Sequence, residues 1–310
     1  MMELIKPGTK IDFIGKLKMF LGISGLIVAI GLGVCLAKGF NLGIDFAGGT
    51  VVQVKFNAPI ALDTIRKGLE AEIGSNFTLQ NFGEMDEVLI RVRENPDMSL
   101  QAFQDSIKAA LEAEFASYSP TIQRVEQVGP QVGDELKKKA YMAMIFSAIG
   151  ILLYVAIRFQ LFFGLSAIIA LVHDIIFTLG IYSISGKEFS ITAMAALLTV
   201  VGYSLNDKIV IFDRIREKLK AGQLAGMGWG ELINKSINEC LTRTVMTSLL
   251  TFLAAISLYI FGGEVINGFA LIMMVGIVIG TYSSMGVAAM AVYLMRNNIG
   301  SKATKAAAAK

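Results

Sequence analysis

The sequence predicts an α-helical membrane protein with six transmembrane helices and one α+β outer domain. Three observations support this fold class. The 310 residues are 54% hydrophobic and only 17% charged, a composition too apolar for a soluble domain. Six apolar runs are each long enough to cross a hydrocarbon core of about 30 Å, which takes about 20 helical residues. A polar insert of about 100 residues separates the first run from the other five and alternates between strand and helix patterns.

The first apolar run extends from about Phe20 to Ala37 and follows four lysines of the N-terminal tail. A secretory signal peptide is the alternative interpretation of this run. The run is long for the apolar region of such a peptide, and it lacks a clear small-x-small cleavage site. We therefore predict an uncleaved membrane anchor.

The other five runs are continuous enough to form unbroken helices. They lie near residues 141–157, 162–184, 191–211, 244–262 and 268–294. None of the five prolines of the chain falls within a predicted span.

Basic residues in the short loops predict the orientation, because cytoplasmic loops carry an excess of Lys and Arg. They gather in the N-terminal tail, at Arg158, in the loop 212–243 and at Arg296. The opposite short loops contain one lysine in all. Three lysines at 137–139 disagree, but they belong to a long translocated segment that is largely exempt from this rule. Both termini are expected in the cytoplasm and the insert outside.

The insert has the pattern of a small α+β domain. Strands are predicted at "TVVQVKF" (50–56), "FTLQNF" (77–82), "EVLIRVR" (87–93) and "TIQRVEQV" (121–128), with "GEMD" (83–86) as a hairpin turn. Helices are predicted from Pro59 to Ile73 and after Pro96 and Ser99. The order β-α-β-β-α-β is that of the ferredoxin-like unit.

These elements divide the chain into five parts. They are a cytoplasmic N-terminal tail (1–18), a first transmembrane helix (19–37), an outer, periplasmic domain (38–139), a five-helix membrane domain (140–295) with a cytoplasmic loop (212–243), and a cytoplasmic C-terminal tail (296–310). The closing "KATKAAAAK" is of low complexity, and we expect it to be disordered.

The fourth apolar run contains an acid, Asp207, in "GYSLNDKIVIFDRIRE" (202–217). A carboxylate in hydrocarbon costs about 2.5–3.5 kcal/mol, so it should face protein or water. Tyr203 and Ser204 share its helix face and offer hydrogen bonds, and Asn206 adjoins it. A protonatable switch is the interpretation we favour, and a polar tie between helices is the alternative.

Three further candidates lie in or beside the spans. Asp174 lies near the middle of the third span, with Thr178 one turn later and His173 next to it but about 100° around the helix. A proton relay through both and simple helix packing remain open for this pair. Arg243, at the cytoplasmic start of the fifth span, either anchors that end or approaches Asp207. Lys208 either approaches the same acid or extends to the cytoplasm.

Glycines mark two positions. In "NLGIDFAGGT" (41–50), Gly43, Gly48 and Gly49 surround Asp45 between the first span and the first strand. No Gly-Lys-Ser/Thr is present, so this is not a phosphate loop, and we predict a hinge. In the last span, Gly276 and Gly280 form a G-x-x-x-G pair, which favours a close helix contact.

The composition excludes several kinds of site. One histidine cannot supply an ordinary zinc site, and two cysteines do not form a disulfide framework. A net charge of +3 without a basic stripe argues against a nucleic-acid partner. An intramembrane aspartyl protease would need G-x-G-D around one acid, which the chain lacks, so we predict that it is not an enzyme.

The motifs "GIDFAGGT", "HD" and "GYSLNDKIVIFDRIRE" resemble those of the SecF subunits of the bacterial Sec protein-export machinery. These subunits belong to the RND-type SecD/SecF family, and the resemblance covers nearly the whole chain. It implies an accessory role in the Sec translocase, in which SecF and SecD use the proton-motive force to draw preproteins outward through SecYEG.

The resemblance also implies particular residues and partners. The proton-coupling residues of the family fall on Asp207, Arg243 and Asp174. Lys208 departs from the pattern, which has an uncharged residue such as threonine there. The implied partners are SecD, SecYEG, YajC, the translocating preprotein and lipid, in a multi-pass inner-membrane assembly. No cofactor is expected, and the driving ion is H⁺ with Na⁺ as the alternative. An RND-type half-transporter of small molecules or lipids is the alternative function.

Overall fold

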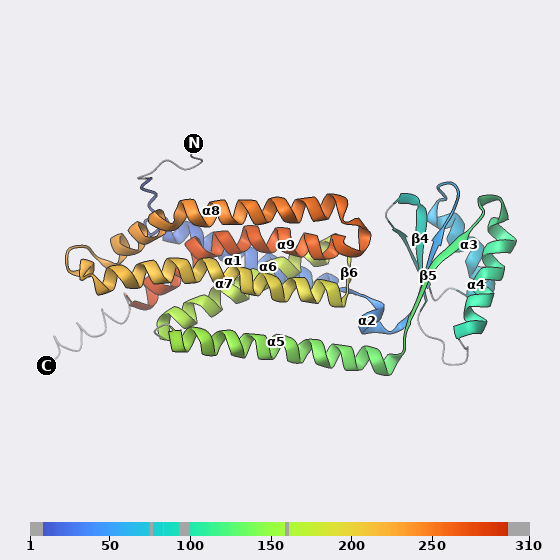
Figure 1. Cartoon of the computed structure of the whole chain (residues 1–310), viewed down its shortest axis with the longest axis horizontal. Helices are drawn as coiled ribbons and strands as arrows, with labels where there is room; N and C mark the ends of the chain where they lie inside the picture. The colour runs from blue at the N-terminus through green and yellow to red at the C-terminus, as the bar shows by residue number, and fades with distance from the viewer. Residues whose placement is uncertain (1–8, 75–76, 83, 93–99, 159–160, 297–310) are drawn as a thin grey trace. The chain divides into compact units, whose positions relative to one another are not determined.

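The computed structural model describes residues 9–74, 77–82, 84–92, 100–158 and 161–296 (Figure 1). The chain forms two compact units. Of the described residues, the helical unit comprises those from 9 to 41, from 144 to 187 and from 192 to 296. The sheet unit comprises 42–143 and 188–191. The predicted C-terminal tail beyond Arg296, the turn residue Gly83, and Pro96 and Ser99 lie outside the described residues.

Six helices in the described part of the chain are long and apolar enough to cross a membrane, which confirms the predicted fold class. They are α1 (Leu17–Lys38), α5 (Pro130–Arg158), α6 (Leu161–Ser185), α7 (Ile191–Lys220), α8 (Trp229–Phe261) and α9 (Gly263–Ser283). After α9 the helix widens into a π-turn, η3 (Ser284–Ala288), and continues to Arg296.

The predicted loop 212–243 is mostly helical. Helix α7 continues to Lys220 and α8 already begins at Trp229, with a short 3₁₀ helix, η2 (Gln223–Ala225), between them. Charged residues stabilise the two extensions against each other. Glu239 of α8 accepts hydrogen bonds from Arg214 Nε at 2.5 Å and Lys218 Nζ at 2.8 Å. The polar composition that predicted a loop therefore belongs to paired helix ends.

Close glycine contacts fix the helix packing. Helix α1 packs on α6, and α9 packs on both α6 and α8. A Cβ on Gly180 of α6 would lie 2.7 Å from the Cα of Gly31 on α1, so only glycine allows this approach. On α9, added Cβ atoms at Gly276 and Gly280 would meet Val200 and Ser204 of α7. The predicted close contact at the G-x-x-x-G pair is confirmed.

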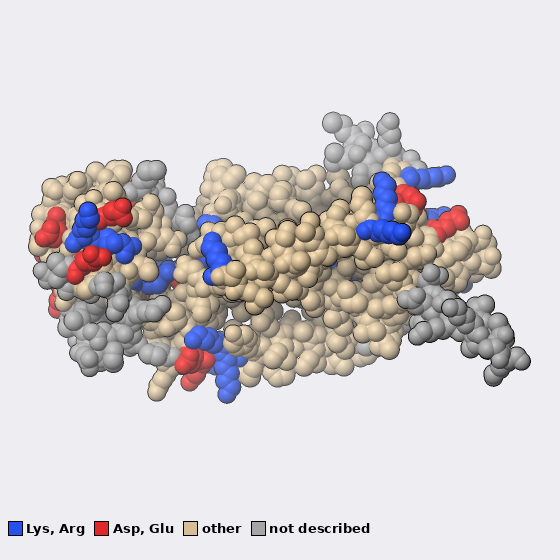
Figure 2. All heavy atoms as spheres, turned by 180° about the vertical axis from the view of Figure 1, so that it is seen from behind, with Lys and Arg blue, Asp and Glu red and all other residues tan. Residues whose placement is uncertain are grey.

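The outer surface of the helical unit matches a lipid environment. On the face shown in Figure 2, the charged side chains gather toward the two ends of this unit, and the stretch between them carries none. Helix α5 is largely exposed, with apolar side chains such as Ile145, Phe146 and Leu153 on its surface. Such exposure is ordinary in hydrocarbon and would be costly in water.

The N-terminal tail is fastened to the helical unit by two asparagines of α8. Asn234 Oδ1 accepts hydrogen bonds from the backbone N–H groups of Phe13 and Ile14, both at 3.0 Å. Asn238 exchanges two hydrogen bonds with the backbone of Ile11, both at 2.8 Å. The Phe13 ring is buried in the main apolar core, so the segment before α1 is part of the folded unit.

The sheet unit has the predicted ferredoxin-like order. Its elements are β2 (Gly49–Lys55), α3 (Leu62–Ile73), β3 (Phe77–Phe82), β4 (Glu84–Val92), α4 (Leu100–Phe115), η1 (Ala116–Tyr118) and β5 (Thr121–Val128). The sheet order is β3-β4-β2-β5, with antiparallel neighbours. Apolar residues of the strands and of α3 and α4 form one core, which includes Val54, Ile65, Leu69, Ile90 and Ile107.

Two details of the predicted insert were wrong. Glu84 to Asp86 belong to β4, so the hairpin is tighter than a "GEMD" turn, and its register shifts between Asn81 and Phe82. Helix α3 begins at Leu62 and not at Pro59, and the residues between them are not helical.

Candidate functional site

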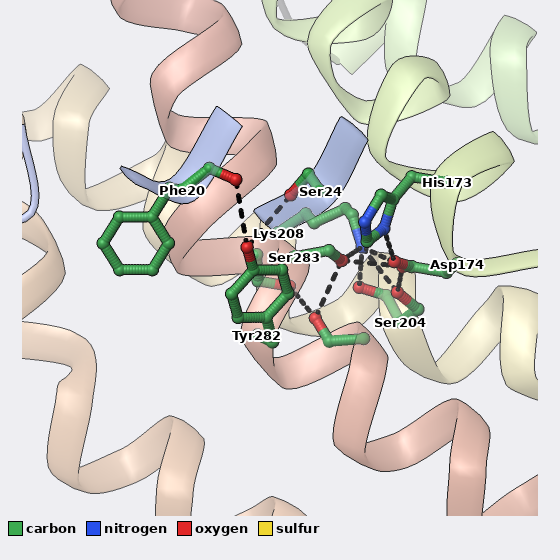
Figure 3. A network of polar contacts seen from close by, with 10 residues as sticks. Phe20, Ser24, His173, Asp174, Ser204, Lys208, Tyr282 and Ser283 are labelled. Atoms are coloured by element: carbon green, nitrogen blue, oxygen red, sulfur yellow. Dashed lines mark hydrogen bonds and ion pairs between the residues drawn. The ribbon is translucent and has the colours of Figure 1, made fainter. Parts of the chain in front are cut away.

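Two polar clusters lie between the membrane-spanning helices. The Asp174 cluster consists of His173 and Asp174 of α6, Ser204 and Lys208 of α7, and Ser283 at the end of α9 (Figure 3). The Asp207 cluster consists of Asp207 of α7, Ser248 of α8 and Thr281 of α9. Both predicted membrane acids are therefore interhelical, as their cost in hydrocarbon requires.

The Asp174 carboxylate has four side-chain partners and is only 1% exposed. His173 Nδ1 lies 3.0 Å from Oδ1. Ser204 Oγ, Ser283 Oγ and Lys208 Nζ lie 2.5, 2.7 and 2.9 Å from Oδ2. A buried charge is tolerated when it is paired and its remaining lone pairs are hydrogen-bonded, and Asp174 meets both conditions.

Lys208 supplies the opposite charge and is completely buried. Besides Asp174, its Nζ donates to Ser283 Oγ at 3.0 Å and lies 2.5 Å from Ser204 Oγ and 3.3 Å from the Ser204 carbonyl. Ser204 and Lys208 are four residues apart, so they share one face of α7. The apolar surroundings hold the pair together because water does not compete for either ion.

The Asp207 carboxylate faces a different pair of helices. It precedes Lys208 by one residue, which turns it by about 100° around α7. Its Oδ2 accepts a hydrogen bond from Ser248 Oγ at 3.2 Å, and Thr281 Oγ1 donates to the same serine at 2.7 Å. Within the described residues no ion pair involves Asp207, although Lys208 and Arg243 both attract its negative charge.

A third group of polar contacts links α9 to α1 beside His173. Tyr282 OH donates to the carbonyl of Phe20 at 3.2 Å and lies 3.0 Å from Ser24 Oγ (Figure 3). The rings of Tyr282 and His173 have their centroids 6.1 Å apart. The Asp174 cluster is thereby bordered by α1 as well as by α6, α7 and α9.

The π-turn begins directly after the cluster residue Ser283. A π-turn inserts an extra residue into the helical ladder, and such turns are frequent at functional sites. The Ser284 hydroxyl donates to the Gly280 carbonyl at 2.7 Å, next to the Ser283 bond to Asp174. The distortion and the polar cluster therefore occupy the same turn of α9.

Several predicted partners were wrong. Ser204 hydrogen-bonds to Asp174 rather than to Asp207, and within the described residues Tyr203 OH has no hydrogen-bond partner. His173 is not turned away from Asp174, because its ring folds back onto the neighbouring carboxylate. Lys208 neither extends to the cytoplasm nor pairs with Asp207, because Asp174 holds it inside.

The other predicted candidates are Arg243, Asn206, whose side chain interacts with the Asp207 carboxylate, and Thr178. The Arg243 side chain is exposed and makes no ion pair with Asp207 in the part of the chain that the structure describes. Asn206 is exposed. Thr178 is fully buried, and within the described residues its hydroxyl has no hydrogen-bond partner.

The glycine motif is held by strand pairing and hydrogen bonds. Asn41–Leu42 (β1) pairs with Glu188–Phe189 (β6), and a single turn of helix, α2 (Ile44–Ala47), follows. Gly43 N–H donates to the Phe189 carbonyl, and Asp45 Oδ2 accepts from the N–H of Ile191 at 2.9 Å. Gly48 and Gly49 have positive φ angles of 72° and 119°, which glycine adopts without strain. The predicted hinge role of this motif stays a prediction.

Sequence reasoning missed Ser248, Thr281 and Ser283. The polar run "TYSS" (281–284) inside the last apolar span was a signal for two of them. No signal distinguishes Ser248 from the other hydroxyl residues of α8. Among the described residues no group of three His, Cys, Asp or Glu side chains could hold a metal ion.

Comparisons with known proteins agree on one family. The model for "Protein export membrane protein SecD/SecF, C-terminal" matches residues 107–298, and that for the "SecD/SecF GG Motif" matches residues 33–60. The chain is 51% identical over 297 residues to the protein translocase subunit SecF of Calditerrivibrio nitroreducens, covering 96% of this chain and 97% of that protein. It is 41% identical to the SecF of Vibrio alginolyticus over 291 residues, covering 93% and 90%.

Solved structures give the same result. The crystal structure of SecDF from Thermus thermophilus, a translocon-associated membrane protein, matches with a TM-score of 0.84 and 39% identity over 94% of this chain. SecDF in its super-membrane-facing form matches with a TM-score of 0.71 and 38% identity over 98% of this chain. The chain spans only 39% and 41% of those two longer chains. With its six spans, ferredoxin-like domain and matching motifs, the chain belongs to the SecF family of protein translocase subunits.

Proposed function

We propose that this chain pairs with a SecD subunit in the bacterial inner membrane and uses the proton-motive force to drive late export of preproteins through SecYEG. The two SecDF chains, of which this chain matches about two fifths, support a SecD partner that supplies the rest. YajC, lipid and the translocating preprotein complete the proposed assembly. The role is one of transport, without catalytic residues or a bound cofactor.

The position of Asp207 is the observation that carries the proposal. Its carboxylate is 2% exposed and is linked through Ser248 to α8 and through Thr281 to α9. Protonation removes the charge and turns the carboxyl group into a hydrogen-bond donor, so the preferred partners on both helices change. This environment supports the proposal that Asp207 converts proton binding into a change of helix packing.

The available energy is sufficient for a two-state motion. One charge that crosses the membrane gains about 2.3 kcal/mol per 100 mV. A difference of this size changes the ratio of two conformations by more than tenfold, since about 1.4 kcal/mol corresponds to a factor of ten. In the proposed cycle, Asp207 takes a proton from the outer side and releases it to the cytoplasm. The sheet unit moves between two positions as Asp207 gains and loses the proton.

Export into inverted membrane vesicles tests the proposal. We expect Asp207→Asn to lose the part of export that depends on the ion gradient and to keep the gradient-independent part. Asp213→Asn is the matched control, because Asp213 lies on the same helix but is 44% exposed and pairs with Arg158 and Arg216. Gradient-dependent export that is normal in Asp207→Asn vesicles would refute the proposal.

A further inference from the structure

The surroundings of the Lys208 ammonium group are those of a cation-binding site. Four oxygen atoms lie within 3.3 Å of Nζ: Asp174 Oδ2, Ser204 Oγ, Ser283 Oγ and the Ser204 carbonyl oxygen. They come from three helices and enclose a group that is completely buried. Main-chain carbonyl oxygens coordinate Na⁺ inside membrane transporters, and hard cations in general take oxygen ligands such as carboxylates.

The oxygen atoms outnumber what the lysine itself needs. An ammonium group donates three hydrogen bonds, and here four acceptors surround it. One carboxylate balances its single positive charge. A lone Na⁺ ion would find the same charge balance and the same oxygen atoms in this position.

We propose that Lys208 is a tethered cation that occupies the Asp174 site and so excludes Na⁺ from it. The proposal deepens the proposed function, since it assigns ion exchange to Asp207 alone. Asp207 interacts with neutral side chains, those of Ser248 and Asn206, and within the described residues it makes no ion pair. Lys208 is then the residue that determines which carboxylate is open to a mobile ion.

The groups around the pair are consistent with this division. The titratable neighbours are His173 on α6, Asp207 on α7 and Tyr282 on α9. Ser24 of α1 hydrogen-bonds to Tyr282, and Ser248 of α8 hydrogen-bonds to Asp207, and both hydroxyl groups are neutral. Lys208 is therefore the only positive charge that contacts Asp174 among the described residues unless His173 is protonated.

The test removes the tethered charge and offers a mobile one. The full-length chain in lipid nanodiscs is unfolded thermally in NaCl and in KCl of equal ionic strength. We expect Lys208→Ala to gain about 5 °C in Tm from sodium at a concentration about 100-fold above its Kd. Equilibrium binding of radioactive Na⁺ should show one ion per chain in this variant.

Three further variants locate the response. The rise in Tm caused by sodium should disappear in the double variant Lys208→Ala, Asp174→Asn. It should persist in the double variant Lys208→Ala, Asp207→Asn. It should be absent from Lys208→Met, whose apolar side chain fills the space without a charge. The wild-type chain should show no sodium stabilisation that depends on Asp174.

Each other outcome overturns the proposal. One such outcome is that sodium does not raise the Tm of Lys208→Ala. The other is that sodium raises the Tm of the wild-type chain and that Asp174→Asn abolishes this rise. Lys208→Thr, which adds a hydroxyl ligand, is a second way to remove the ammonium group in case Lys208→Ala does not fold. If both it and Lys208→Ala fail to fold in NaCl as well as in KCl, sodium does not replace the ammonium group. Normal gradient-dependent export by Asp207→Asn would instead refute the proposed function and leave the sodium result intact.

Discussion

At the scale of single residues, two acids on neighbouring helices have opposite surroundings. Asp174 is matched by a buried ammonium group, whereas Asp207 is hydrogen-bonded to a neutral serine. In a medium of low dielectric constant, separating two paired ions costs much free energy, so the pair stays together. A carboxylate without a paired cation is costly to keep charged there. The proposed roles follow this difference, with Asp174 stabilising the helix packing and Asp207 exchanging protons.

Asp174→Asn should strongly destabilise the chain, because it leaves the Lys208 ammonium buried without an opposite charge. Breaking one side of a buried ion pair costs about 3–5 kcal/mol. The measurement is the free energy of unfolding in detergent. Adding Lys208→Met should recover part of the loss, since no charge is then buried. A single Asp174→Asn variant as stable as the wild type would show that the pair is not what holds these helices.

The side chain of Asn234 makes three of the hydrogen bonds that hold the N-terminal tail. Asn234→Ala removes its hydrogen bonds to Asp12, Phe13 and Ile14, and should cost about 1–3 kcal/mol of local stability. Faster hydrogen exchange of residues 9–16 would report the release of the tail. Lys235→Ala, at the exposed next position, is the matched control and should leave exchange unchanged. Equal exchange in both variants would contradict the assignment.

The same tail carries a small pH dependence. Hydrogen bonds from the Gly15 N–H and from Asn234 lower the pKa of Asp12 below its ordinary value of 3.8. A carboxyl group with a lowered pKa stabilises the fold above its ordinary pKa and loses that contribution as the pH falls through the lowered value. The contribution of Asp12 is therefore complete near neutral pH.

At the scale of helices, the contact between α7 and α9 joins both polar clusters. Gly280 lies opposite Ser204 of the Asp174 cluster, and Thr281 next to it belongs to the Asp207 cluster. The π-turn after Ser283 lies in the same region of α9. A packed contact without spare volume transmits a small displacement from one helix to the other.

Gly280→Ala should displace Ser204, because the new Cβ would lie 2.9 Å from its Oγ and 3.0 Å from its Cβ. Overpacking of this kind costs about 1–3 kcal/mol. Thermal unfolding in detergent and gradient-dependent export are the measurements, and both should fall. Gly202→Ala on α7 is the control, because its Cβ would meet nothing within 4 Å. If the two alanine variants behave alike, the tight contact has no role.

At the scale of the whole molecule, the helical unit and the sheet unit need different solvents. The helical unit exposes apolar side chains along α1 and α5, whereas the sheet unit buries its apolar residues between one sheet and two helices. Lipid covers the first surface without cost, and water covers the second. Lipid therefore suits the helical unit and water suits the sheet unit. The orientation of the chain decides on which side of the membrane the sheet unit lies.

The predicted orientation is tested with cysteines. After replacement of Cys35 and Cys240, a cysteine at the exposed Lys108 of the sheet unit should react with a membrane-impermeant thiol reagent on spheroplasts. A cysteine at the exposed Ala221, between α7 and α8, should react only after the membrane is permeabilised. The reverse pattern would place the termini outside and would contradict the excess of basic residues in the inner loops.

The sequence by itself determined the six spans, the ferredoxin-like order and the two membrane acids. Apolar length, the two-residue period of strands and the cost of a charge in lipid are local properties, so they can be read along the chain. It also indicated the contact at Gly276 and Gly280, because a missing side chain favours close approach on whichever helix it lies.

Only the tertiary structure decided the partners of the charged groups. Lys208 is adjacent to Asp207 in the sequence but pairs with Asp174, 34 residues away, and Ser283 joins them from 109 residues beyond Asp174. The physical reason is rotation: neighbouring residues on a helix point about 100° apart, and which direction meets another helix depends on how all the helices pack. A nearly uniform apolar surface does not encode that rotation, whereas the glycine contacts and the buried ion pair fix it in space.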